Sequence, residues 1–124
     1  MTLNDAITKF DTVCKNNIPA DIKVNWISNF DSSVYKEIIL AYDNSNSVSF
    51  QPYDDNTPDD TVLLIEDPYS DVYLKYLSIK KDLYYSDIAR YNNDLVLFNE
   101  AYYNFKNYYN RTNKHSKIVE YFNA

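Results

Sequence analysis

RYNNDLVLFNEAYYNFKNYYNRT, residues 90–112, is the stretch of sequence that decides the fold. Its apolar and aromatic side chains recur every three or four residues, at Leu95, Phe98, Tyr102, Phe105 and Tyr109. On an α-helix this spacing places them on one face. The opposite face carries polar residues, namely Asn99, Glu100, Lys106, Asn107 and Asn110. The stretch therefore predicts an amphipathic helix whose aromatic face packs against the rest of the chain.

The composition is that of one globular domain with two unusual features. The chain has 124 residues, of which 45% are hydrophobic and 24% charged, enough for a single modest core. It contains no Gly and fourteen Tyr. Without Gly, tight hairpin turns are difficult to form, which disfavours an all-β fold. Tyr is favoured at protein interfaces, although an AT-rich genome would also enrich the chain in Tyr and Asn.

Two further helices are predicted in the first third of the chain. Thr2, followed by Asp5 three residues later, is a suitable N-cap pair for a first helix that ends near Lys15. A second helix is expected from Ala20 to about residue 42, with Trp26 in the core.

A third helix is predicted from the Asp67–Pro68 pair to about Ile88, because Asp suits the N-cap and Pro the first helical position. Asp71 and Lys75 are spaced to form an ion pair on its surface. A break near residues 91–93 is then expected before the fourth helix.

The segment between the second and third helices is polar and rich in Asn, Ser, Asp and Pro. Residues 48–50 and 62–65 are short and apolar or β-branched, so they are candidates for a two-stranded hairpin. The predicted fold class is therefore mainly α: a small bundle of about four helices, with a long loop or short β-hairpin between helices two and three and an extended C-terminal tail.

No pattern in the chain indicates catalysis, a cofactor or a metal. The acidic residues of the 54–60 segment lack the alternating ligands, the Gly and the closing Glu of a calcium loop. His115 is the single histidine, and phosphate-cradling loops need Gly. We expect a protein that is not an enzyme and that has no cofactor. The net charge of −6 also argues against a protein that grips nucleic acid.

The expected compartment follows from the lone cysteine and the hydropathy. Cys14 cannot form a disulfide within one chain, which fits a reducing compartment. No signal peptide is visible, and no apolar run approaches the roughly 20 residues of a membrane span. We expect a protein made in the cytosol, without membrane contact.

Residues 113–124 differ from the helical domain of residues 1–112 because they are first polar and then apolar. The apolar tip comprises Ile118, Val119, Tyr121 and Phe122. Such a terminus either frays or docks into a neighbouring protein, and we predict docking. The basic residues around it make nucleic-acid contact a weaker alternative.

Three Tyr doublets occur along the predicted helices, at residues 84–85, 102–103 and 108–109. On a helix, each doublet is expected to place one ring inward and the other outward. Several outward aromatic rings on adjacent helices are typical of protein contacts.

Three blocks of the sequence resemble the small head-tail connector, or adaptor, proteins of long-tailed bacteriophages. The blocks are WISNFDSSVYKEII (26–39), DTVLLIEDPYSDVYLKYL (60–77), and RYNN with FNEAYYNFKNYYNRT within 90–112. Together they cover about half of the chain. The sequence departs from the family at Ser86 and Asp87, where a Gly is usual shortly before the Tyr-Asn-Asn block.

The resemblance implies a structural virion protein. Such a subunit joins about twelve copies in a ring beneath the portal, extends the DNA channel without binding DNA specifically, and offers a surface to the next connector or tail protein. Its location would be the neck of the virion, assembled in the host cytoplasm. On this reading residues 43–60 face a neighbour or the channel, and the 113–124 tail reaches the portal. The expected subunit contacts are Tyr102, Tyr103, Asn107, Tyr109 and Arg111.

One alternative of a different class remains open from the sequence. A small helical protein-binding module, acting as a monomer or dimer, would regulate one host or phage protein. Ring formation on a portal would distinguish the connector from this module.

Overall fold

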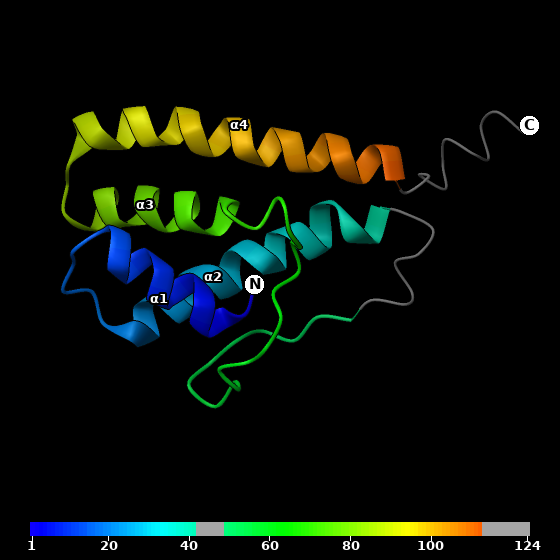
Figure 1. Ribbon diagram of the computed structural model, residues 1–124, viewed down its shortest axis with the longest axis horizontal. Helices are drawn as coiled ribbons and strands as arrows, with labels where there is room; N and C mark the ends of the chain where they lie inside the picture. The colour runs from blue at the N-terminus through cyan, green and yellow to red at the C-terminus, as the bar shows by residue number, and fades with distance from the viewer. Residues whose placement is uncertain (42–48, 113–124) are drawn as a thin grey trace, which may run out of the picture.

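A computed structural model describes residues 1–41 and 49–112 of the chain. It contains α1 (Leu3–Val13), α2 (Ala20–Glu37), the 3-10 helix η1 (Ile39–Ala41), α3 (Val72–Tyr84) and α4 (Ile88–Thr112). Figure 1 shows α4 as an outer layer over α3, with α1 and α2 on the other side of α3. The prediction of a small, mainly helical fold is confirmed.

The start of α1 is fixed by the predicted pair. The Thr2 hydroxyl accepts a hydrogen bond from the Asp5 N–H at 3.1 Å, and the Asp5 carboxylate accepts one from the Thr2 N–H at 3.2 Å. These bonds form a capping box and hold the pKa of Asp5 below its usual value. The helix ends at Val13, two residues before the predicted end, because Cys14 has an extended backbone.

The second helix is shorter than predicted. It ends at Glu37 and is followed by the single 3-10 turn of η1, so the helical stretch stops at Ala41. Ile27, Phe30 and Val34 are buried as its spacing predicts. Trp26, expected in the core, is half-buried at its edge, with its ring 6.1 Å from that of Tyr84 in an edge-to-face contact.

The third helix begins at Val72 rather than at Pro68, which corrects the predicted start. The segment before Val72 is a series of turns in which the N–H of Tyr69 bonds to the Glu66 carbonyl and that of Val72 to the Tyr69 carbonyl. Each of these bonds joins an N–H to the carbonyl three residues earlier, whereas the bonds of an α-helix join residues that are four apart. The predicted ion pair between Asp71 and Lys75 is present at 2.9 Å.

The break before α4 lies at residues 85–87, not at residues 91–93. Ser86 adopts a left-handed backbone conformation with φ of 58°, which ends α3 sharply. Asp87 then starts α4, since its carboxylate accepts a hydrogen bond from the Arg90 N–H at 3.2 Å. Residues 91–93 continue the helix. The turn thus occupies the place where the resembled family has a Gly.

The predicted stripe of α4 is the face that packs. Phe98 and Phe105 are buried, and the other three stripe residues are half-buried. The ring of Phe30, from α2, lies at the centre of this packing, 5.7 Å from that of Phe98 and 4.7 Å from that of Tyr76. Stacked and edge-to-face contacts of this kind add to the area that the rings bury.

Residues 49–71, before α3, form a loop, because this part of the described chain contains no β-strand. The predicted pairing of residues 48–50 with 62–65 is therefore wrong for residues 49 and 50, and residue 48 lies outside the described residues. Residues 61–63 run beside the N-terminus instead: the Leu63 N–H donates to the Met1 carbonyl at 3.1 Å and the Leu3 N–H to that of Thr61 at 2.8 Å. The N-terminus supplies the partner that the hairpin would have needed.

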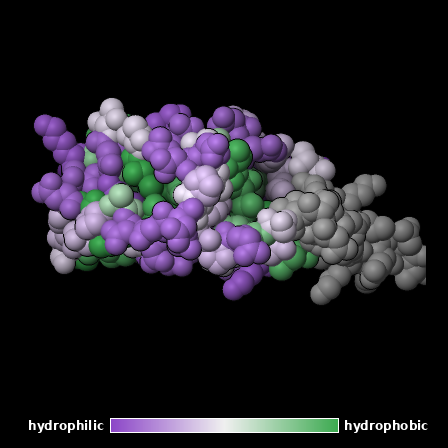
Figure 2. Space-filling view, turned by 90° about the horizontal axis from the view of Figure 1, so that it is seen from below, coloured by the Kyte–Doolittle hydropathy of each residue, from purple (hydrophilic) through white to green (hydrophobic). Residues whose placement is uncertain are grey.

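The face of the molecule formed by α1, α2 and this loop carries no continuous apolar area. Figure 2 views the molecule from that side and shows separate hydrophobic areas between hydrophilic residues. None of the helices in residues 1–41 and 49–112 has both the length and the hydropathy that a membrane crossing requires.

Candidate protein-interaction surface

The outward face of α4 presents an exposed stripe that ends in the predicted contact residues. Val96 and Tyr103 are 64% and 61% exposed, which places them among the more exposed large apolar side chains of the described residues. Asn107 and Arg111 follow Tyr103 at intervals of four, on the same face as Tyr103. In Figure 1 no other described element lies over this face. We name these four residues the outer stripe.

The predicted contact residues therefore separate into two groups. Tyr103 and Arg111 are exposed and Asn107 is half-buried, all on the outer stripe. Tyr102 and Tyr109 lie on the packing face: Tyr109 has its ring 5.9 Å from that of Phe105. The structure does not bring the five residues onto one surface.

Tyr102 belongs to the aromatic core. Its ring lies 5.4 Å from that of Phe30 and 5.6 Å from that of Phe98, with the Lys106 ammonium 4.9 Å from its centre. Burial, followed by the charges of Glu37 and Asp31, raises the pKa of Tyr102 to about 12. The side chain is a packing residue with a partly accessible edge.

One of the three Tyr doublets, residues 102–103, has one ring inward and one ring outward as expected. Tyr103 is exposed and its neighbour half-buried, as predicted, whereas Tyr84 and Tyr85 are both 48% exposed. Tyr108 and its neighbour are both half-buried, and Tyr108 stacks on Tyr69 with ring centres 4.6 Å apart. The predicted alternation is wrong at these two doublets because α3 ends at Tyr84 and because Tyr69 offers a packing partner beside α4.

A shallow groove of about 460 Å³ lies between α4 and the residues around the start of α3. Its lining is mixed: Tyr69 and Leu97 supply apolar surface, while Asp71, Lys75 and Glu100 supply charge. Leu97 is 50% exposed at its border. The groove adjoins the outer stripe, since Glu100 lies on the outward face of α4 beside Val96 and Tyr103.

Asp31 holds the long loop against the helices, and the sequence interpretation missed this role. Its carboxylate is fully buried and accepts hydrogen bonds from the hydroxyls of Tyr53 at 2.7 Å and Tyr73 at 2.6 Å, and from the Leu64 N–H at 3.2 Å. The Tyr73 hydroxyl in turn accepts the Ile65 N–H at 2.8 Å. One carboxylate thus connects α2, α3 and two points of the loop.

The protonation of this cluster follows from its burial. Burial raises the pKa of Asp31 above its usual value, and the hydrogen bonds from Tyr73, Tyr53 and Leu64 oppose that rise. Burial and the Asp31 charge raise the pKa values of Tyr53 and Tyr73. The two phenols therefore remain protonated and donate their hydrogen bonds over the physiological pH range.

The burial of Asp31 could have been predicted from the sequence, since Asp31 lies four residues after Ile27 and three before Val34, on the apolar face of α2.

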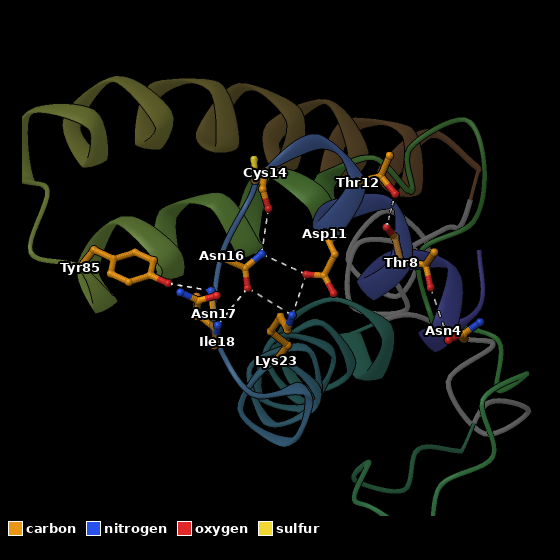
Figure 3. Close-up of polar contacts among 10 residues, drawn as sticks. All are labelled: Asn4, Thr8, Asp11, Thr12, Cys14, Asn16, Asn17, Ile18, Lys23 and Tyr85. Atoms are coloured by element: carbon orange, nitrogen blue, oxygen red, sulfur yellow. Dashed lines mark hydrogen bonds and ion pairs between the residues drawn. The ribbon is translucent and has the colours of Figure 1, made fainter.

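A second polar cluster fixes the connection between α1 and α2 (Figure 3). Lys23 is 4% exposed, and its ammonium lies 2.6 Å from the Asp11 carboxylate and 3.3 Å from the Asn16 side-chain oxygen. Asn16 also donates to Asp11 at 3.0 Å and to the Cys14 carbonyl at 2.8 Å. Every polar atom of the Asn16 side chain is thereby used within the cluster, which indicates a structural role.

The same connection reaches the end of α3. The Asn17 N–H donates to the Tyr85 hydroxyl at 3.0 Å, as Figure 3 shows. Cys14, in the same connection, is half-buried and packs against the core.

Asp82 is a buried carboxyl near the same end of α3. It is 1% exposed, and its side-chain oxygens have no hydrogen-bond partner among the described residues, although the Lys81 ammonium lies 3.8 Å away. Burial, followed by the nearby Asp94 carboxyl on α4, raises the pKa of Asp82 to about 6, against the opposing charges of Lys81 and Arg90. The two carboxyl groups face each other across the α3–α4 contact.

No group of three or more His, Cys, Asp or Glu side chains with metal-site geometry occurs in the part of the chain that the structure describes. The predicted docking residues Ile118, Val119, Tyr121 and Phe122 lie outside the described residues, as do residues 43–48 of the segment 43–60 that was expected to face a neighbour or the channel. Their roles stay predictions. Comparison of the chain with protein-family models, with curated proteins and with solved structures found no match.

Proposed function

We propose that the protein is a head-tail connector of a long-tailed bacteriophage, which joins about twelve copies in a ring under the portal. The proposal combines the resemblance of three sequence blocks with the surface of the folded chain. The ring extends the DNA channel and links the head to the next connector or tail protein.

The observation that carries the proposal is the uncovered outer stripe of α4. A large aromatic side chain that is 61% exposed, Tyr103, lies between Val96 and Arg111 on the outermost helix. Aromatic residues and Arg are the side chains most enriched at protein contacts and at their energetic centres. The stripe supports a role in binding protein, and the net charge of −6 suits a channel through which DNA slides.

The tail supplies the second element of the proposal. Residues 113–124 follow α4, and their apolar tip is suited to docking in a groove of the portal. A subunit with a docking tail and a separate lateral surface can bind the portal and its own neighbours at once. A monomeric regulatory module would need one of these surfaces, not both.

The tail assignment is tested by replacing Ile118, Tyr121 and Phe122 together with Ser. We expect loss of portal binding with an unchanged circular dichroism spectrum and thermal midpoint, since the tail follows the last described helix. Replacing Asn113, Ser116 and Asn123 with Ala is the matched control in the same segment, and it is expected to bind normally. Portal binding that survives the Ser variant would refute the tail assignment.

The lateral surface is tested by Tyr103→Ser. The side chain is exposed, so the substitution is expected to leave stability within about 0.5 kcal/mol of the parent and to reduce the number of copies held on each portal. Tyr84→Ser, at the far end of the bundle, is the comparison variant. Equal portal occupancy for both variants would remove the outer stripe from the proposed ring contact.

A further inference from the structure

Two groups of exposed charged side chains without an ion pair lie on opposite sides of the molecule. Asp55, Asp59 and Asp60 are exposed on the loop, and none of them has an ion-pair or hydrogen-bond partner for its side chain within residues 1–41 and 49–112. Lys106 and Arg111 are exposed near the end of α4, also without an ion pair in that part of the chain. Figure 1 shows the loop on the side of the α1–α2 layer that faces away from α4.

The acidic side is a fixed surface. Tyr53 anchors one end of the segment through its N–H, which donates to the Ser28 hydroxyl at 2.9 Å, and through its hydroxyl on Asp31. The Asn4 N–H holds the other end by donating to the Asp59 carbonyl at 3.1 Å. The acidic side chains therefore project from a backbone that is tied to α1 and α2.

A hollow of about 320 Å³ adjoins these acidic residues. Its apolar lining includes Phe50, Pro52, Pro58 and Val62. Val62 is 69% exposed, a large value for an apolar side chain next to a charged segment. The acidic side thus combines an apolar hollow with a rim of unpaired negative charge.

The outer stripe of α4 has the complementary features. Tyr103 supplies an exposed aromatic ring, and Arg111 lies about 12 Å further along the helix, two turns away. An aromatic side chain in a hollow with charged groups at its rim is the usual arrangement of a strong protein contact.

We propose that the partner of each surface is a second copy of this chain, with Tyr103 of one copy in the hollow of the next and Lys106 and Arg111 facing Asp59 and Asp60. The inference rests on the proposed ring and deepens it by naming the two surfaces that meet. Because the surfaces lie on opposite sides of the molecule, the contact is head-to-tail and not two-fold. A head-to-tail contact repeats from copy to copy and closes into a ring when the rotation allows.

The test uses two charge-reversed forms of the full chain. The acid-side variant carries Asp59→Lys with Asp60→Lys, and the base-side variant carries Lys106→Glu with Arg111→Glu. Each variant alone carries charges of the same sign on its two surfaces, which should therefore repel each other. We expect its self-association constant, measured by sedimentation velocity at low ionic strength, to be lower than that of the parent by about tenfold or more. The effect is expected to shrink at about 1 M salt, where the Debye length is about 3 Å.

An equal mixture of the two variants is the decisive arm. Acid-side and base-side copies have opposite charges at every mixed contact, so the mixture is expected to recover association beyond a dimer. Lys9→Glu with Lys15→Glu, on α1 and its connection to α2, makes the same change in net charge as the base-side variant and is expected to associate like the parent. Unchanged association in the two reversed forms, or a mixture no better than either alone, would overturn the inference.

A crosslink locates the contact directly. In a Cys14→Ser background, Tyr103→Cys combined with Val62→Cys is expected to form disulfide-linked chains of more than two copies. Each single cysteine variant is expected to give no such chains. Crosslinking of Tyr103→Cys to itself would show a two-fold contact and contradict the head-to-tail arrangement.

Portal binding separates this inference from the proposed function. If the parent forms rings on the portal and the charge-reversed forms do so equally well, the connector function stands and the named contact is wrong. If the parent ignores the portal but its variants behave as described in solution, the contact stands and the connector function is wrong.

Discussion

Tyr73→Phe removes one hydroxyl from the centre of the molecule and tests how the loop is held. The side chain is fully buried, and its ring packs edge-on against Phe30 with centres 5.6 Å apart, a contact that Phe preserves. The hydroxyl donates to the Asp31 carboxylate at 2.6 Å and accepts the Ile65 N–H at 2.8 Å. The substitution therefore removes two hydrogen bonds and leaves the ring in place.

The expected cost follows from those two bonds. A hydrogen bond to a charged group contributes about 1.5–3 kcal/mol, and a buried N–H left without a partner costs about 1–3 kcal/mol. Allowing for relaxation of the loop, we expect a loss of about 3 kcal/mol in the free energy of unfolding. For a domain of this size that corresponds to a fall of about 10 °C in the thermal midpoint.

Two other Tyr→Phe variants provide the comparison. Tyr53→Phe removes a single bond to Asp31, at 2.7 Å, and is expected to cost about 2 kcal/mol. Tyr76 is half-buried on the same helix, its ring stacks on Phe30 at 4.7 Å, and its hydroxyl has no hydrogen bond among the described residues. Tyr76→Phe is expected to cost less than about 0.5 kcal/mol.

Urea denaturation, followed by the fluorescence of the single Trp, Trp26, gives the free energies of unfolding of the three variants in the same buffer. The expected order of destabilisation is Tyr73→Phe, then Tyr53→Phe, then Tyr76→Phe. A Tyr73→Phe variant as stable as Tyr76→Phe would refute the reasoning, because the buried hydroxyl would then contribute nothing.

Two further predictions concern the ends of α3 and α4. The pKa of Asp82 is about 6 in the folded chain and 3.8 ordinarily. The folded state therefore binds more protons between these values, and stability falls as pH rises from about 4 to about 6. Thermal midpoints measured across this range should decrease, and Asp82→Asn should flatten the decrease. Ser86 has φ of 58°, so Ser86→Gly is expected to stabilise the chain by about 1 kcal/mol in urea denaturation, and a destabilised variant would contradict the left-handed assignment.

Patterns with a local physical cause could be predicted from the sequence. The capping box of Thr2 and Asp5 and the ion pair of Asp71 with Lys75 depend on residues three or four apart, and both are present. The packing face of α4 was predicted because its aromatic spacing is regular over five positions. Such features need no knowledge of the rest of the fold.

Contacts between distant residues could not be predicted in the same way. The bond from Tyr73 to Asp31 spans 42 positions and that from Tyr85 to Asn17 spans 68. The residues near Asp31 in the sequence do not indicate its hydrogen-bond partners, although its position on the apolar face of a helix predicts that its carboxyl group is buried. The pairing of the N-terminus with residues 61–63, which is found where the hairpin was predicted, could not be predicted either, because it also joins distant residues.

The predicted contact residues all lie on α4, but they are divided between its packing face and its outward face. Tyr103 and Arg111 could be placed outward by periodicity alone. Tyr102 and Tyr109 have the same side chain as Tyr103, but they lie on the packing face of α4 and contact the core. The exposure of a Tyr residue on α4 therefore follows from its position relative to the buried stripe and not from its residue type.

The connector proposal is tested most directly by mass photometry of the purified chain, alone and mixed with the portal protein encoded near its gene. We expect the mixture to give a portal-bound particle whose added mass corresponds to about twelve copies of the chain, each of 14.7 kDa. A small particle whose mass is unchanged by the portal would contradict the proposal and favour a regulatory module that acts as a monomer or dimer.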